Sequence, residues 1–136
     1  MKKLLIICLI LMATTAYAEL DSTGVGDTYI AITWTAPGDD GATGVASEYD
    51  LRYSTEPIDA SNFYTATRDN SIQVPDTAGT RQYHTIHGLE PDVTYWIAIK
   101  TADEVPNWSG ISNILVVKTL DATPPATIID CEVYEE

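Results

Sequence analysis

The stretch that decides the fold is YHTIHGLEPDVTYWIAI, residues 83–99. Two runs within it alternate side chains with a period of two, which is the pattern of a β-strand. The second run places Tyr95, Ile97 and Ile99 on one face, whereas the inward face of the first run is ambiguous. Between the two runs, Gly88–Asp92 supplies turn residues. The stretch therefore predicts two β-strands separated by a turn.

Four more runs of this kind lie outside the stretch, and helical periodicity is absent after residue 18. In one of them Ile30, Ile32 and Trp34 face the same way. Segments rich in Pro, Gly and Asp separate the runs. Six short strands predict an all-β antiparallel sandwich, because two facing sheets are the simplest way to bury alternating apolar side chains. The four runs are 29–34, 49–53, 72–74 and 111–118, and the separating loops include 37–41, 57–62, 75–79 and 103–110.

Taken in chain order, these segments resemble a fibronectin type III domain. Residues 32–37, ITWTAP, are similar to the family's second strand, whose tryptophan fills the core, and 49–54, YDLRYS, resemble its third. Residues 89–95, LEPDVTY, match its Leu-x-Pro-x-x-x-Tyr turn, which the tyrosine hydroxyl holds in place. The loop 103–109 looks like the last loop of bacterial members. The resemblance covers 23–119 and implies an immunoglobulin-like sandwich. Its implied core is Trp34, Tyr49, Leu51, Tyr53, Leu89, Tyr95, Ile97 and Ile99.

Both ends of the chain depart from the family pattern. The family's first strand precedes the tryptophan strand, but residues 19–27 hold few large apolar side chains, which predicts that this strand is short or missing. Residues 120–136 resemble a linker followed by the possible first strand of a further module. Two interpretations stay open for this tail. It belongs to a fragment of a longer protein, or residues 126–133 pair by strand exchange with the weak edge of the same or a neighbouring chain.

Residues 1–18 have the three-part pattern of a secretory signal peptide. A short basic start, the apolar run 4–12 and the small residues Ala16 and Ala18 follow one another in the expected order. The apolar run is too short to span a bilayer, which needs about 20 residues. We therefore expect cleavage after Ala18, a domain over 19–119, a secreted or periplasmic location and no membrane insertion of the mature chain.

The charge balance argues against nucleic acid as a partner. The chain holds 20 acidic residues against 7 Lys and Arg, and its formal net charge is -13. Nucleic acids and anionic membrane surfaces are bound by basic faces, which such a composition disfavours. We expect a protein or a glycan as the partner instead.

Catalytic motifs are missing from the sequence. It holds no Gly-x-Ser-x-Gly elbow. His84 and His87 are three residues apart on a predicted strand, so they point to opposite faces and are poorly placed to share a metal. Cys131, the single cysteine left after cleavage, is expected to be an inert thiol or to form an intermolecular bridge. We predict that the protein is not an enzyme and needs no cofactor, with calcium as the possible exception.

Acidic residues collect in the loops 36–46, 75–80 and 103–110, which the resemblance places at one pole of the sandwich. Calcium takes about six to eight oxygen ligands, so several carboxylates within reach would suit it. Aspartate is also a common turn former, and solvated turns are the alternative interpretation. The candidate ligands are Asp39, Asp40, Asp76, Asp103 and Glu104.

Two tryptophans are candidate contacts for a protein or glycan partner. Trp108 lies in the last loop and Trp96 on an outward face, where either ring can stack on a ligand. We expect Arg52 beside Trp96, in a cation–π contact. Alternatively, Trp108 closes the end of the sandwich and Arg52 covers Trp96. The sequence favours a secreted spacer or adhesion module over two rivals, an accessory domain or fragment of a larger secreted hydrolase and a calcium-dependent adhesion domain.

Overall fold

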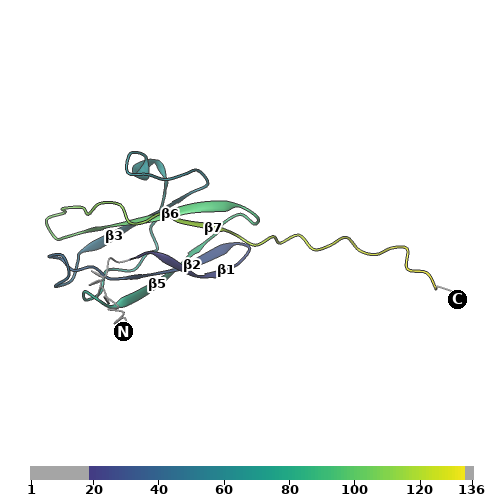
Figure 1. The fold of residues 1–136 in the computed structure, drawn as a ribbon, viewed down its shortest axis with the longest axis horizontal. Helices are drawn as coiled ribbons and strands as arrows, with labels where there is room; N and C mark the ends of the chain where they lie inside the picture. The colour runs from purple at the N-terminus through teal and green to yellow at the C-terminus, as the bar shows by residue number, and fades with distance from the viewer. Residues whose placement is uncertain (1–18, 134–136) are drawn as a thin grey trace, which may run out of the picture.

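A computed structural model describes residues 19–133 and shows two antiparallel β-sheets that face each other (Figure 1). The smaller sheet has the strand order β1-β2-β5, and the larger has β4-β3-β6-β7. The predicted all-β, immunoglobulin-like sandwich is therefore confirmed. The predicted signal peptide, 1–18, lies outside the described residues. The elements are β1 (Asp21–Val25), β2 (Tyr29–Thr35), β3 (Glu48–Ser54), the 3-10 helix η1 (Phe63–Thr65), β4 (Thr67–Asp69), β5 (Arg81–His87), β6 (Thr94–Ala102) and β7 (Leu115–Lys118).

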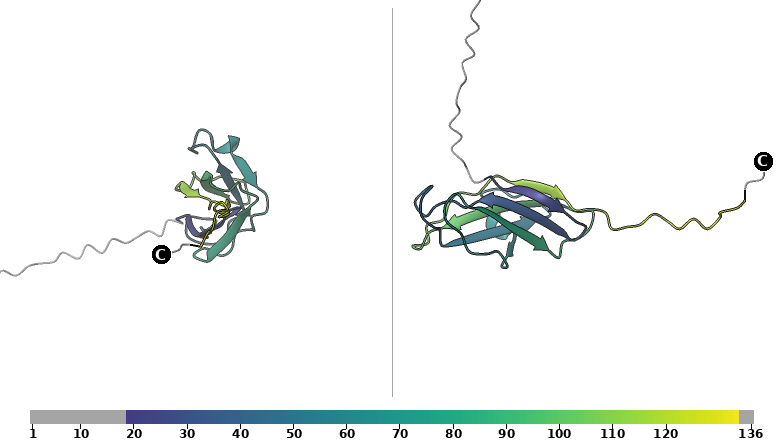
Figure 2. Two further views of the ribbon diagram at one scale, coloured as in Figure 1. Left: turned by 90° about the vertical axis from the view of Figure 1, so that its right-hand side faces the viewer. Right: turned by 90° about the horizontal axis from the view of Figure 1, so that it is seen from below.

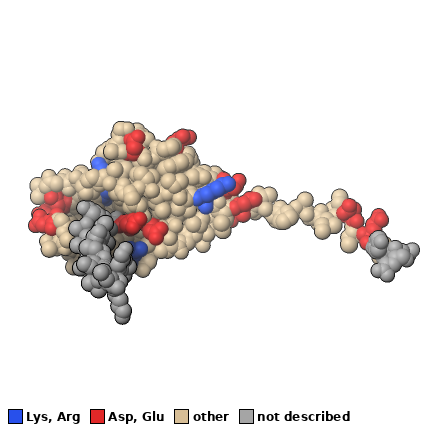
Figure 3. All heavy atoms as spheres, viewed as in Figure 1, with Lys and Arg blue, Asp and Glu red and all other residues tan. Residues whose placement is uncertain are grey.

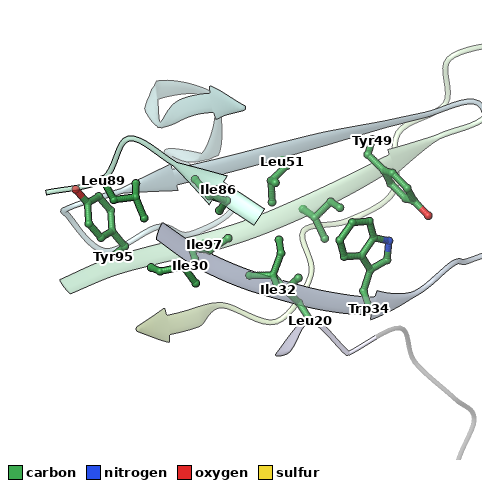
Figure 4. Packing of buried hydrophobic residues seen from close by; sticks show 11 residues of the cluster. Leu20, Ile30, Ile32, Trp34, Tyr49, Leu51, Ile86, Leu89, Tyr95 and Ile97 are labelled. Atoms are coloured by element: carbon green, nitrogen blue, oxygen red, sulfur yellow. The ribbon is translucent and has the colours of Figure 1, made fainter. Parts of the chain in front are cut away.

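The main core fills the seam between the two sheets (Figure 4). Along β2, Ile30, Ile32 and Trp34 are all fully buried. Trp34 packs edge-on against Tyr49 of the opposite sheet, with ring centroids 5.3 Å apart. Full burial of one large apolar side chain contributes about 1.5–3 kcal/mol, so the cluster as a whole holds the sheets together. It comprises Leu20, Ile30, Ile32, Trp34, Tyr49, Leu51, Ile86, Leu89, Tyr95, Ile97 and Ile99, with Tyr53 packed against it.

The first strand is present and short, so the alternative that it is missing is wrong. β1 pairs antiparallel with β2, with an irregularity between Ser22 and Gly24. Just before it, Leu20 is 1% exposed and belongs to the core. The Leu20 backbone N–H donates to Asn113 Oδ1 at 2.9 Å, and Asn113 Nδ2 donates back to the Leu20 carbonyl at 2.8 Å. One buried leucine and one asparagine thus anchor a strand with few apolar residues of its own.

The predicted strand over 72–74 is wrong, and β4 forms the edge of the larger sheet instead. Asp69 ends β4, because its Oδ1 accepts hydrogen bonds from the backbone N–H and the hydroxyl of Ser71, at 2.8 and 2.6 Å. The following segment is joined to β5 by a side chain, since Gln82 Nε2 donates to the Val74 carbonyl at 3.2 Å. A glutamine amide replaces strand pairing here, so the apolar alternation does not produce a strand.

The last strand is shorter than the predicted 111–118, because β7 begins at Leu115. Before that point the chain runs beside β6 without a regular ladder. The backbone N–H of Ile99 donates to Ser112 Oγ, and that of Thr101 donates to Ser109 Oγ, both at 3.0 Å. Serine hydroxyls therefore take positions that a strand backbone would fill.

A second, smaller apolar cluster lies on the outer face of the larger sheet. The connection 55–66, which includes η1 and projects from the sandwich in Figure 1, carries Ile58 and Phe63 onto Ala98 of β6. Phe63 is 0% exposed. Trp96 is half-buried against this cluster, so the tryptophan predicted as a ligand contact has a packing role on this face.

In place of the predicted cation–π contact with Trp96, Arg52 makes such contacts with two other aromatic rings. The Arg52 guanidinium carbon lies 5.5 Å from the centre of the Phe63 ring and 5.3 Å from that of Tyr64. Its Nε donates to Asp50 Oδ1 at 2.8 Å. Phe63 is the single phenylalanine of the chain and lies in a segment of turn-like composition, which is why the pattern of strands gave no hint of this cluster.

The pole of the sandwich from which the tail leaves is closed by hydrogen bonds. Tyr95 Oη accepts a hydrogen bond from the Glu90 backbone N–H at 2.9 Å, as a tyrosine corner does. Thr119 is 3% exposed, and its Oγ1 donates to the Glu90 carbonyl at 2.6 Å and accepts from the Val93 N–H at 3.0 Å. We call this end, made of residues 26–28, 88–93 and 118–120, the closed pole.

Residues 120–133 leave the closed pole as an extended segment that forms no strand (Figures 1 and 2). Ile128 is 78% exposed and Ile129 92%. Cys131 is an exposed free thiol. Strand exchange through 126–133 with a neighbouring chain stays a prediction. Within the described part of the chain, no helix has the length and apolar character needed to cross a membrane.

Candidate functional site: the open pole

Loops that are far apart in the sequence meet at the end of the sandwich opposite the tail. The loop 75–80 is bonded to the loop 36–46, because the Gly79 N–H donates to the Ala36 carbonyl at 2.9 Å and the Ala78 N–H donates to the Gly44 carbonyl at 3.0 Å. Between the loop 36–46 and the last loop lies a pocket lined by residues of both. We call this end, made of 36–46, 75–80 and 103–110, the open pole.

The loop 36–46 is held in shape by its own backbone. Gly38 donates its N–H to the Gly41 carbonyl at 2.8 Å, and Thr43 accepts from the Asp40 N–H at 3.3 Å. A Cβ at Gly38 would lie 2.1 Å from the Thr43 carbonyl oxygen, so only glycine permits this close approach. The loop therefore presents Asp39 in a fixed place.

The loop 103–110 is organised by one carboxylate. Asp103 Oδ1 accepts from the backbone N–H of Val105 at 3.0 Å and of Asn107 at 2.7 Å, and Asp103 Oδ2 accepts from Asn107 Nδ2 at 2.7 Å. These hydrogen bonds, first among them the one from the Asn107 backbone, lower the pKa of Asp103. Next in the chain, Trp108 forms an isolated bridge with Ala102. The half-buried indole is thus carried by a well-ordered turn.

The pocket of the open pole has a volume of about 900 Å³. Its lining combines buried apolar residues, Ala46, Ile99 and Ala102, with the half-buried Trp108. Carboxylates from three separate segments also line it. These are Glu19, Asp39 and Asp103. The pocket therefore offers an apolar and aromatic surface beside acidic groups, and no Lys or Arg of the described residues lines it.

The surroundings of Asp39 disfavour its charged form. The side chain is half-buried, and its Oδ1 is a buried atom that has no hydrogen-bond partner among the described residues. Desolvation raises the pKa of Asp39, and the neighbouring carboxyl of Glu104 and the charges of Asp40 and Asp103 raise it further. Acidic side chains are grouped at this end of the surface in Figure 3. Among residues 19–133, the charged groups that act on Asp39 are all acidic, so none of them compensates its negative charge.

The structure gathers four of the five carboxylates that were predicted to be calcium ligands. Asp40, Asp103 and Glu104 all influence Asp39. Asp76 is exposed and its Oδ1 accepts from the Thr77 N–H. Among residues 19–133, however, no group of three Asp, Glu, His or Cys side chains is arranged to hold a metal ion. Calcium binding stays a prediction.

His84 and His87 lie on opposite faces of β5, as predicted. His84 Nε2 is 2.9 Å from Asp69 Oδ2, and both side chains are 10% exposed. Desolvation raises the pKa of Asp69, but hydrogen bonds from Ser71 and His84 outweigh it and lower the pKa overall. His87 is exposed, with its ring 6.2 Å from that of Tyr29. The His84–Asp69 pair joins β5 of one sheet to β4 of the other, which is a structural role.

The sequence analysis named Trp108, Asp39 and Asp103 but missed the other residues that line the pocket with them. The apolar lining of the pocket comes from residues such as Ala46 and Ala102, which carry no recognisable motif. Glu19, which also lines the pocket, lies far from the other acids in the sequence. The one available hint was the resemblance, which placed the three loops at a single pole.

Comparisons with known proteins agree with the fold. The family model of the fibronectin type III domain matches residues 16–114. The chain is 36% identical over 114 residues to calcium-activated chloride channel regulator 1 of Equus caballus, an alignment that covers 75% of this chain and 12% of that protein. The Homo sapiens protein of the same name is 32% identical over 110 residues, again covering 75% of this chain and 12% of that one. The chain thus spans about an eighth of the length of these relatives.

Solved structures show the same architecture. The fn3 domain of human contactin 1 superimposes with a TM-score of 0.57 at 17% identity, covering 80% of each chain. The fibronectin type-III domain of human fibronectin type III domain containing protein 3 gives a TM-score of 0.52 at 16% identity, covering 81% of this chain and 89% of that one. At such identities the likeness describes the fold alone.

Proposed function

The chain belongs to the fibronectin type III family, and from this premise we propose that it is a non-catalytic spacer or adhesion module that presents its open pole to a protein or glycan partner. The observation that carries the proposal is the pocket of about 900 Å³ beside Trp108. Ligand sites are concave and mostly apolar, with a few polar groups that fix orientation. The open pole has these properties, whereas the closed pole satisfies its polar groups internally.

A binding role rather than a catalytic one is supported by how the pocket hydroxyls are used. Ser109 Oγ accepts from the Thr101 N–H and donates to the Gly110 carbonyl. Ser112 Oγ accepts from the Ile99 N–H and donates to the Asn113 carbonyl. A serine nucleophile needs an adjacent base to take its proton, and these hydroxyls are committed to the backbone instead.

We also propose that the module works outside the cytoplasm. The support is the signal-peptide pattern of residues 1–18. Cell fractionation of the producing organism, followed by N-terminal sequencing of the mature chain, tests this. We expect the chain in the periplasm or medium with Glu19 as its first residue, and recovery of uncleaved chain in the cytoplasm would contradict it.

Two assays of the mature chain test the binding role. We would measure retention of the soluble chain on a glycan array, and adhesion of chain-coated beads to surfaces of the producing cells. Trp108→Ala is the test variant and Trp96→Phe is the matched control. We expect Trp108→Ala to lose retention and Trp96→Phe to keep it, because Trp96 packs on a different face. Equal retention by the two variants would remove the open pole from the proposal.

A calcium-dependent form of adhesion is the second candidate. The observation that favours it is the mutual proximity of the carboxyl groups of Asp39, Asp103 and Glu104. Hard cations bind such oxygen donors. Calorimetric titration with millimolar calcium is the test, and the absence of both heat and a change in melting temperature would exclude this candidate.

A further inference from the structure

The open-pole pocket combines an apolar surface with an acidic one. Its apolar part consists of Ala46, Ile99 and Ala102 with the half-buried ring of Trp108. Its polar part includes the carboxylate of Asp39. A neutral apolar ligand would leave the carboxylates desolvated, and a small ion would leave the apolar part unused. A ligand with an apolar stem and a cationic end satisfies both.

The carboxyl group of Asp39 has surroundings that disfavour its charged form. Asp39 Oδ1 is buried and accepts no hydrogen bond from the described residues. Leaving a buried acceptor without a partner costs free energy, and more so when the group is charged. Desolvation and the adjacent Glu104 raise the pKa of Asp39, which is the direction expected where a cation is absent. A ligand that brings positive charge to the Asp39 carboxyl group would supply the compensation that the described residues do not.

The chain's own described cations are engaged elsewhere. None of them lines the pocket, and each has an interaction partner on another part of the sandwich. Arg52 is bound to Asp50, Arg68 is near Glu48 and Asp50, Arg81 reaches Thr35, Lys100 donates to Tyr64, and Lys118 is bound to Asp92. None of these side chains is therefore placed to compensate the charge on Asp39.

A metal ion fits this site less well than a side chain does. Asp103 spends three acceptor interactions on Val105 and Asn107 of its own loop, which leaves it little capacity as a ligand. Calcium needs about six to eight oxygens. A guanidinium or ammonium group needs one or two carboxylates, and an adjacent tryptophan ring adds a cation–π contact.

We propose that the open-pole pocket binds the side chain of an arginine or lysine on a protein partner, with the stem against Trp108 and the charged end at Asp39. This inference rests on the proposed binding function and names its partner chemistry. Arginine is the better fit of the two, because its planar group can stack on an indole and donate several hydrogen bonds at once.

The test uses the mature full-length chain and two small probes, N-acetyl-arginine amide and N-acetyl-citrulline amide, which have nearly the same shape but differ in charge. Backbone and indole NMR shifts report the site of binding. We expect the arginine probe to shift Trp108 and loop 36–46, and the citrulline probe to bind at least about tenfold more weakly, the loss that follows from removing a charge-assisted hydrogen bond. The lysine analogue is the third probe, and we expect its affinity to lie between those of the other two.

Variants assign the contacts. We expect Trp108→Ala and Asp39→Asn each to weaken binding of the arginine probe at least about fivefold. Trp96→Phe and Asp59→Asn are matched controls outside the pocket and should leave the affinity for the arginine probe unchanged. Thermal melts show that each variant is folded, and Trp108→Tyr, which keeps an aromatic face, should restore most of the affinity.

Three outcomes overturn the inference: equal binding of the arginine and citrulline probes, shifts confined to other surfaces, or saturation of the same resonances by calcium at lower concentration than by arginine. The proposed function fails separately. Loss of arginine selectivity with adhesion retained contradicts only the partner chemistry, whereas arginine selectivity without adhesion to any surface contradicts the adhesion role.

Discussion

The two poles of the sandwich are built from the same kinds of residue and use them in opposite ways. At the closed pole, the hydroxyls of Tyr95 and Thr119 satisfy backbone groups of the neighbouring loop. At the open pole, Trp108 lines a pocket and Asp39 holds a buried oxygen without a partner among the described residues. One end satisfies its polar groups internally, and the other carries a carboxyl group whose charge the described residues do not compensate.

This contrast gives a way to separate residues that hold the fold from residues available for binding. A buried polar group that has its partners contributes to stability, whereas one without them costs free energy until something binds. The same aromatic or acidic residue type should therefore give opposite results at the two poles.

The largest expected difference is between the two aromatic truncations. Tyr95 is 5% exposed in the main core, so Tyr95→Ala should destabilise by about 3–5 kcal/mol, the range for deletion of a buried aromatic ring. Trp108→Ala should cost at most about 1 kcal/mol, because its half-buried ring lies in an exposed loop. Urea denaturation of both variants measures this, and comparable losses would show that the open pole is also a structural element.

A matched pair of threonines gives the next largest difference. Thr119 Oγ1 is buried and bonded to the carbonyl of Glu90, so Thr119→Val should cost about 1–3 kcal/mol by leaving buried backbone groups unpaired. Thr43 at the open pole donates to the Asp40 carbonyl in an exposed bond of 3.2 Å, and Thr43→Val should change stability by less than about 0.5 kcal/mol. Equal effects in urea denaturation would contradict the contrast.

The closed pole could be predicted from the sequence and the open pole only in outline. The turn 89–95 lies within one continuous segment, so local pattern and resemblance together identify its tyrosine. The uncompensated charge of Asp39 depends on how two loops pack against each other, which no local sequence pattern encodes. Asp103 looked like a metal ligand, but its carboxylate organises its own turn.

The dependence on packing between distant segments also explains where the predicted strands differ from the observed ones. Alternation identified β2, β5 and β6 because each of these strands buries alternate side chains over part of its length. It failed at 72–74 and 111–114, where glutamine and serine side chains bond to neighbouring backbone. Phe63 was missed because it reaches the sheet from an irregular connection.

Two acids within the open pole are expected to respond to pH with opposite sign. The folded chain raises the pKa of Asp39 above its ordinary 3.8, so its stabilising contribution is present below that value and lost as pH rises through the raised pKa. The folded chain lowers the pKa of Asp103, so its contribution is present above 3.8 and lost as pH falls through the lowered pKa.

At neutral pH, Asp39→Asn should therefore raise the melting temperature and Asp103→Asn should lower it. Both differences should shrink in strongly acidic buffer, where the wild-type carboxyl groups become neutral. Calorimetric melts across the acid range measure this, with Glu104→Gln as the control, which should reduce the gain from Asp39→Asn. A loss of stability on Asp39→Asn at neutral pH would mean that its charge already has a partner.

The smallest expected effect comes from the one exposed ion pair at the closed pole. Lys118 Nζ lies 2.6 Å from Asp92 Oδ1, with both side chains more than half exposed. An exposed pair contributes about 0.2–1 kcal/mol and is screened by salt. Lys118→Met should thus cost no more than that in low salt and nothing measurable in molar salt. A larger, salt-independent loss would show that the closed pole depends on this charge and not on the hydroxyls of Tyr95 and Thr119.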